Sequence, residues 1–252
     1  GATDDKYLYI KEGHNGIEFS TNSKTEGVGV WSSENPYEND GNIWDKDTET
    51  KTYTNNITLS SSKNNGKTSE AGKEDEKEYD ISYGLRLSGN LTGVNFVNNA
   101  SITGIINAIP NNSNDVGNDS GNGYGYGIYN TSTMGNIENR GIISGTGYGS
   151  DRGITYNKSY GYGYGIYNLS TMGSIINRGV ISGTGYGYNN GYSNGYGYGI
   201  YNSSTMGDIT NSGIISGSGT GSDYLNKKGY GYGLGYGIYN SGTMENITNT
   251  GI

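Results

Sequence analysis

The side chains of this sequence that could act as acids or bases are few and irregularly placed. Within the repeated part of the chain the carboxylates belong to Glu138, Asp151, Asp208, Asp223 and Glu245, and none of these positions is acidic in every copy of the repeat. Glycoside cleavage requires two carboxylates at a set separation, and other acid–base or nucleophilic catalysis also needs groups that converge. We therefore expect no catalytic residues and no enzyme activity.

Metal and cofactor sites are also not indicated. There is no Cys and only one His, His14, which excludes thiolate and multi-histidine sites. The run from Asp40 to Glu49 places oxygen donors at alternate positions and resembles a weak calcium site, but it lacks the full EF-hand pattern. We interpret it as a solvated turn and His14 as an ordinary surface residue, so we expect no metal and no cofactor.

Tyrosine is the most conspicuous side chain that could bind a ligand. The chain has 26 Tyr and 47 Gly, and several linkers alternate the two strictly. In an extended strand this alternation places every ring on one side and bare backbone on the other. These segments can pack against the rest of the fold, or their rings can bind sugars or proteins. We name Tyr148, Tyr186, Tyr188 and Tyr192 as candidate ligand-binding residues.

The net negative charge lies in the first third of the chain. Residues 1–80 contain 9 Lys or Arg and 17 Asp or Glu, whereas residues 81–252 contain 7 of each, so the net charge of −8 lies in the first segment. An acidic chain without a basic run does not favour nucleic acid or anionic lipid. No stretch is apolar enough to span a membrane. No apolar segment follows a basic one at the N-terminus, so we expect that the signal peptide of an exported protein has already been removed.

The positions of these residues are organised by an internal repeat of a 19-residue core and a variable linker. The copies begin near residues 127, 165, 199 and 237, and their methionines are 38, 34 and 38 residues apart. A degenerate copy covers 84–104. Each core contains three short β-type runs separated by Gly, Asn, Ser or Thr, and Gly argues against helices. We predict an all-β, right-handed parallel β-helix of roughly triangular section, with three short strands per coil and Gly/Tyr-rich loops projecting from one corner.

Alignment with the degenerate copy predicts which residues face inward. Ile143 aligns with Ile102 and should be buried, whereas Ile142 aligns with Ser101 and should face out. We expect ladders of Asn along the axis, and an aromatic ladder on one outer face. Asn next to Gly should also tolerate the left-handed backbone of a corner. The residues are Asn139, Asn177, Asn211 and Asn249, with a further possible ladder of Asn130, Asn168, Asn202 and Asn240, and the rings Tyr129, Tyr167, Tyr201 and Tyr239.

We divide the chain into an acidic capping region, 1–82, and the repeat β-helix, 83–252. The first region matches no repeat; its expected strands are 7–10, 16–19, 28–31 and 56–59, and 60–78 is expected to be a mobile loop. Because the last copy stops within a repeat, we expect the chain to be a fragment of a longer one.

The repeat resembles the passenger domains of bacterial autotransporters (type V secretion). The similarity covers residues 84–252 and is strongest at 239–252, which read YNSGTMENITNTGI. It implies a role in virulence and export through the outer membrane of a Gram-negative bacterium by a C-terminal β-barrel that this chain lacks. It also implies display at the cell surface as an adhesin.

Three functions remain open at this stage. The first is a surface-exposed or secreted adhesin or stalk that attaches cells by binding host or bacterial surface glycans or proteins. The second is an extracellular fibre or matrix protein that self-associates through its Tyr faces. The third is a polysaccharide-cleaving β-helix enzyme, for which a carboxylate pair would be needed.

Overall fold

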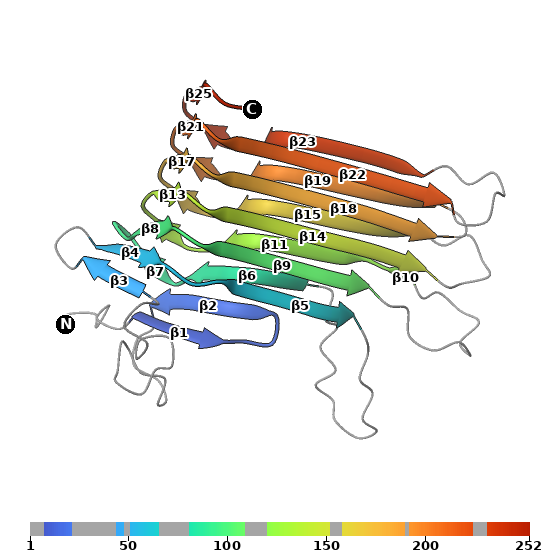
Figure 1. The fold of residues 1–252 in the computed structure, drawn as a ribbon, viewed down its shortest axis with the longest axis horizontal. Coiled ribbons are helices and arrows are strands. Elements are labelled where there is room, and N and C mark those ends of the chain that lie inside the picture. The colour runs from blue at the N-terminus through green and yellow to red at the C-terminus, as the bar shows by residue number, and fades with distance from the viewer. Residues whose placement is uncertain are drawn as a thin grey trace, which may run out of the picture.

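The computed structural model describes residues 8–21, 44–47, 51–65, 81–108, 120–151, 158–189, 192–223 and 231–252. Within these ranges the chain forms β-strands and no helix, and successive copies of the repeat lie on one another as coils of a parallel β-helix (Figure 1). The predicted fold class is therefore confirmed. Consequently, no helix among the described residues could cross a membrane.

Three main sheets run along the axis. The tyrosine sheet consists of β1 (Leu8–Glu12), β2 (Gly16–Thr21), β6 (Ile81–Ser88), β11 (Gly123–Asn130), β15 (Lys158–Asn168), β19 (Tyr192–Asn202) and β23 (Tyr232–Asn240). The hydroxyl sheet consists of β5 (Leu59–Asn65), β9 (Ser101–Ala108), β14 (Ile142–Asp151), β18 (Val180–Asn189) and β22 (Ile214–Asp223), with β10 (Ser120–Gly121) beside β14. The short sheet consists of β3 (Trp44–Asp47), β4 (Thr52–Asn55), β8 (Asn95–Asn98), β13 (Ile137–Asn139), β17 (Ile175–Asn177), β21 (Ile209–Asn211) and β25 (Ile247–Asn249).

Two-residue strands connect the tyrosine sheet to the short sheet at each corner: β7 (Asn90–Leu91), β12 (Thr133–Met134), β16 (Thr171–Met172), β20 (Thr205–Met206) and β24 (Thr243–Met244). Equivalent residues pair in parallel from coil to coil, as in the series Ile128, Ile166, Ile200 and Ile238. The register is therefore kept although the linkers differ in length. The tips between the long strands, 152–157, 190–191 and 224–230, lie outside the described residues.

The Gly-Tyr linkers differ from the prediction because they are strands and not loops. They extend β14, β15, β18 and β19 to ten or eleven residues, so the tyrosine and hydroxyl sheets continue beyond the apolar core as two layers (Figure 1). Glycine makes this contact possible: a methyl group at Gly163 would overlap the backbone oxygen of Thr184, and one at Gly147 that of Tyr162. The coil is therefore flattened. Large side chains are enclosed mainly at the end bounded by the short sheet, and beyond it Ile106 and Ser193 are buried between the two layers.

The apolar core lies between the three sheets at that end. As predicted, Ile143 is 0% exposed whereas Ile142 is 44% exposed. Four residues per coil fill the core in the regular repeats, and their equivalents in the last coil are less covered because no coil follows among the described residues. The buried members are Ile128, Ile166, Ile200, Met134, Met172, Met206, Ile137, Ile175, Ile209, Ile143 and Ile181.

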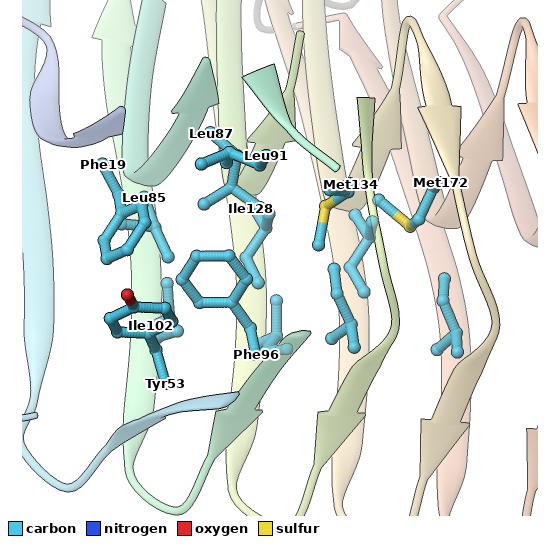
Figure 2. Close-up of a cluster of buried hydrophobic side chains, with 14 of the residues drawn as sticks. Phe19, Tyr53, Leu85, Leu87, Leu91, Phe96, Ile102, Ile128, Met134 and Met172 are labelled. Carbon is cyan, nitrogen blue, oxygen red and sulfur yellow. The ribbon is translucent and has the colours of Figure 1, made fainter. Parts of the chain in front are cut away.

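The N-terminal region contributes coils that the sequence pattern did not show. β2 pairs with β6, β4 with β8 and β5 with β9, all in parallel. Phe19, Tyr53 and Phe96 fill the core here with edge-to-face rings whose centroids are 5.2 and 4.6 Å apart (Figure 2). Larger aromatic side chains thus occupy the space that Ile and Met fill in later coils. For this reason the sequence pattern does not show that the N-terminal strands are equivalent to those of the repeats.

Two expected features of this region were wrong. Residues 56–58 form a corner between β4 and β5, and 60–65 belong to strand β5 instead of a mobile loop. Leu59 anchors β5 by pairing with Ile102, although most other residues of the strand are polar. The expected strands 7–10 and 16–19 largely coincide with β1 and β2, and 28–31 lies outside the described residues.

We predict that Gly163→Ala destabilises the fold and Gly237→Ala does not. The first adds a methyl group where the backbone of Thr184 lies, which should lower the free energy of unfolding by about 1–3 kcal/mol. A methyl group at Gly237 would meet only the oxygen of Ile215, at 3.5 Å, so its effect should stay below about 1 kcal/mol. Urea unfolding of both variants provides the comparison, and equal losses would contradict the role assigned to glycine.

Candidate functional site

The outer face of the tyrosine sheet is covered by three columns of phenol rings. The outer column is Tyr124, Tyr162 and Tyr196; the central column is Tyr126, Tyr164, Tyr198 and Tyr236; the inner column is Tyr129, Tyr167, Tyr201 and Tyr239. These rings face outward because the glycines between them face the hydroxyl sheet. The predicted aromatic ladder, our inner column, is confirmed, and two further columns lie beside it.

The strands break their alternation once to place these columns. Tyr126 and Tyr129 both lie on the outer face, whereas Gly127 and Ile128 between them face inward. Gly127 is skipped in the regular pairing with β15, and a methyl group there would crowd the oxygen of Gly165 in the next coil. The irregularity lets one strand serve both the glycine contact and the apolar core.

Most rings within a column are stacked, although the planes of Tyr129 and Tyr167 differ by 31°. The central and inner columns are close to perpendicular at Tyr164 and Tyr167, whereas Tyr162 and Tyr164, from the outer and central columns, have planes only 6° apart. Tyr124 and Tyr162 have centroids 4.7 Å apart and planes 1° apart, and Tyr167 and Tyr201 have values of 4.7 Å and 3°. Between columns, Tyr164 and Tyr167 meet at 89°. These stacked and edge-to-face contacts follow from the coil spacing and from the preference of aromatic rings for offset and edge-to-face arrangements. Ring faces are consequently covered by other rings, so a ligand would meet ring edges and hydroxyl groups.

Packing among the rings also changes their acidity. Burial raises the pKa of Tyr164 and Tyr162 well above the usual value, and neighbouring phenols raise it further because a second phenolate would be repelled. Burial raises the pKa of Tyr167 to about 12, with Tyr201 and Tyr129 contributing in the same direction. All three phenols are therefore neutral at physiological pH.

Among the described side chains, the charged groups near this face lie at its N-terminal end. Tyr83, which continues the central column toward the N-terminus, donates a hydrogen bond from its hydroxyl to Glu18, 2.9 Å away. Arg86 lies 3.9 Å from the same carboxylate and 6.0 Å from the centroid of the Tyr129 ring. From β11 onward the three columns contain only Tyr, apart from Leu234, which continues the outer column.

Both predicted asparagine ladders are present. In the first, each side-chain amide donates to the next at 2.8–3.0 Å, through Asn98, Asn139, Asn177, Asn211 and Asn249. In the second, the equivalent distances are 2.8 Å, through Asn130, Asn168, Asn202 and Asn240. The same amides also bond the corner backbone. No left-handed residue occurs in the described part of the four regular repeats, so the expectation that Asn adopts that conformation was wrong.

A third ladder escaped the sequence analysis. Side-chain oxygens of Asn95, Asn136, Ser174 and Asp208 each accept the backbone N–H of the equivalent residue one coil further on, at 2.7–3.2 Å. The available signal was a small oxygen-bearing residue two positions after each Met. Asp208 thus has a structural role. Another acid, Glu138, is paired with Arg140 and Arg178.

Three of the four candidate ligand-binding tyrosines, Tyr148, Tyr186 and Tyr188, belong to strands of the opposite, hydroxyl sheet. Tyr148 and Tyr186 are half-buried and stacked, with centroids 4.8 Å apart, beside outward columns of Ser and Thr. The side chains of Tyr188 and Tyr192 lie outside the description, although their backbones belong to β18 and β19. β19 is in the tyrosine sheet, so the four residues do not share one face.

Among the described side chains, no three His, Asp or Glu residues gather where they could hold a metal. Asp151 and Asp223 end equivalent strands two coils apart, but their side chains are also outside the description. No protein-family model, curated protein or solved structure matches this chain. The functional interpretation therefore depends on the geometry of the two outer faces.

Replacing a central asparagine should be far more costly than replacing a terminal one. Asn177 is fully buried and its amide links Asn139 to Asn211, so Asn177→Ala leaves buried groups unpaired and should cost about 2–4 kcal/mol. Asn249 is exposed at the last coil, and Asn249→Ala should cost less than about 1 kcal/mol. Urea unfolding curves would measure both, and similar costs would contradict an axial ladder.

The tyrosine columns should make the fold sensitive to alkali. The pKa values of Tyr162, Tyr164 and Tyr167 are higher in the folded than in the unfolded chain, where the value is 10.0. The stability that these neutral phenols contribute is therefore fully present below pH 10 and decreases as the pH rises through about 12. Tyrosinate absorbance should therefore rise together with loss of the β-sheet circular dichroism signal. Urea-unfolded chain should titrate near the ordinary tyrosine pKa of about 10. Titration of every ring near pH 10 without unfolding would contradict the packing described.

Proposed function

We propose that this protein is a non-enzymatic adhesive stalk that binds an uncharged, hydroxyl-rich glycan along the tyrosine sheet. The observation that carries this proposal is the set of three in-register phenol columns, free of charged side chains from β11 to β23. Their repeat along the axis suits a ligand that is itself extended and periodic, since each coil offers the same contacts again.

The orientation of the rings specifies the kind of contact. Stacking within columns covers the ring faces, so sugar rings cannot lie flat on most of them. Outward hydroxyl groups and ring edges remain, and a phenol hydroxyl both donates and accepts hydrogen bonds. Asn194, next to this face, donates from its amide to the Tyr196 hydroxyl at 3.0 Å, which shows that neutral polar groups can bind these phenols. Glycan hydroxyls and amides supply the same chemistry.

The carboxylates of the repeats favour a binding role over cleavage, because two of them already have structural partners. Glu138 is occupied by two arginines, and Asp208 by the backbone N–H of Asn246. Glu245, the other acid of the repeats whose side chain is described, is exposed in the last coil, and the equivalent position is Gly in the earlier regular copies. A self-associating fibre is the second possibility, because uncharged columns would not repel those of another copy.

We place the protein outside the cell, at the surface of a Gram-negative bacterium. The net charge of −8 and the absence of Cys suit a soluble chain that does not depend on disulfides. The parallel β-helix is compatible with the autotransporter passenger domains that the repeat resembles. In line with the adhesin role that this resemblance implies, the ligand would be a glycan of a host or neighbouring cell.

Binding of the chain to an array of neutral polysaccharides and oligosaccharides tests the proposal. Tyr162→Phe removes one outward hydroxyl but keeps the stacked ring, so affinity should fall by about 2–10-fold, the equivalent of one hydrogen bond. Tyr186→Phe, the same change on the hydroxyl sheet, should leave affinity unaltered. Absence of any glycan binding would refute the proposal, as would loss of binding only in Tyr186→Phe. Filaments that form as concentration rises would instead favour the fibre.

A further inference from the structure

Successive coils of this protein have no disulfides to join them, but they bring pairs of phenols into contact. The chain contains no Cys. In the outer column, the Tyr162 ring lies 4.7 Å from that of Tyr124 and 5.1 Å from that of Tyr196, centroid to centroid. In the inner column, Tyr201 lies 4.7 Å from Tyr167 and 4.9 Å from Tyr239. Each pair joins residues 34 or 38 positions apart in the chain.

The geometry of these pairs suits a carbon–carbon bond between rings. Planes in the four pairs differ by 1–18°, and parallel pairing of the strands places the rings in the same orientation. Carbons ortho to the hydroxyl on neighbouring rings are therefore about as far apart as the centroids. To bond, the two rings must turn out of the stack about their side-chain bonds, while parallel pairing on both sides holds the backbone of both strands in register.

We propose that the outer and inner columns are sites of oxidative cross-linking, in which phenols of consecutive coils couple to dityrosine. The oxidant is a one-electron oxidant of the haem peroxidase class acting with hydrogen peroxide. Each of two phenols loses one electron and one proton, the two radicals form one bond between ortho carbons, and both rings regain their aromatic form after the ortho hydrogens move to oxygen. One hydrogen peroxide accepts the two electrons and two protons and yields two waters.

Burial and neighbours select which pairs react. Tyr126 and Tyr164 of the central column are each only 6% exposed, so they are shielded from an external oxidant. Ile81 and Leu234 flank the outer column and end it, which leaves the pairs 124–162 and 162–196. Because the partner is already in contact, coupling within one molecule is favoured over coupling between molecules in dilute solution. The product would tie coil to coil covalently.

The test exposes the intact chain at low concentration to horseradish peroxidase and hydrogen peroxide. We expect dityrosine fluorescence in the monomer, a mass loss of two hydrogens per bond, and linked peptides that join neighbouring members of one column. The yield should exceed that of urea-unfolded chain at the same concentration by roughly tenfold.

Two conservative variants locate the reaction. Tyr162→Phe should abolish the 124–162 and 162–196 linkages and leave 167–201 intact, because phenylalanine keeps the ring but cannot form a phenoxyl radical. Tyr232→Phe is the control, since Tyr232 is exposed, pairs with Asn194 instead of a tyrosine and lies outside the three columns. Cross-links mainly between molecules, linkages unrelated to the columns, or equal yields from folded and unfolded chain would overturn the proposal.

Discussion

Parallel, in-register hydrogen bonding between consecutive coils is the interaction on which the other features depend. It sets the same spacing along the axis at every position, so each side chain contacts the side chain at the equivalent position in the next coil. Asparagines satisfy one another and the corner backbone, isoleucines form a narrow core, and tyrosines stack. A single displaced register would remove all three kinds of contact at once, since strand residues alternate between the two faces.

Glycine adapts this scheme to a chain with few apolar residues. Hydrophobic residues make up 31% of the sequence, against the usual value of about 45–50%. Beyond the core, the two long sheets contact each other mainly through glycine backbone, with a few buried side chains such as Ile106 and Ser193 between them, and most large side chains there lie outside as tyrosines. Burial then occurs on the outer surface, where rings cover one another. The same packing closes the ring faces, which determines how a ligand could approach.

Comparison of the first coils with the later ones shows where pattern reading fails. Phe96 of the degenerate copy pairs with Ile137, as its alignment predicted, whereas Tyr53 occupies the same position one coil earlier in a segment that matches no repeat. Strand β5 presents mostly polar residues and resembles a loop in composition, yet Leu59 and parallel pairing with β9 hold it in the sheet. Repeat detection needs similar residues, whereas a coil needs only compatible volume and register.

The repeat period and its pattern of apolar, Asn and Tyr positions were enough to predict the fold class, the inward isoleucines, both asparagine ladders and one tyrosine ladder. Such features follow from translation of one unit along an axis, so an alignment of the equivalent residues in successive copies is enough to predict them. Tertiary structure alone decided the contact between the two long sheets and the covering of ring faces by neighbouring rings. It also decided the ladder through Asn136 and Ser174 and the N-terminal coils that the sequence pattern did not show. These depend on distances between different faces and segments, which the spacing of residues in one repeat does not determine.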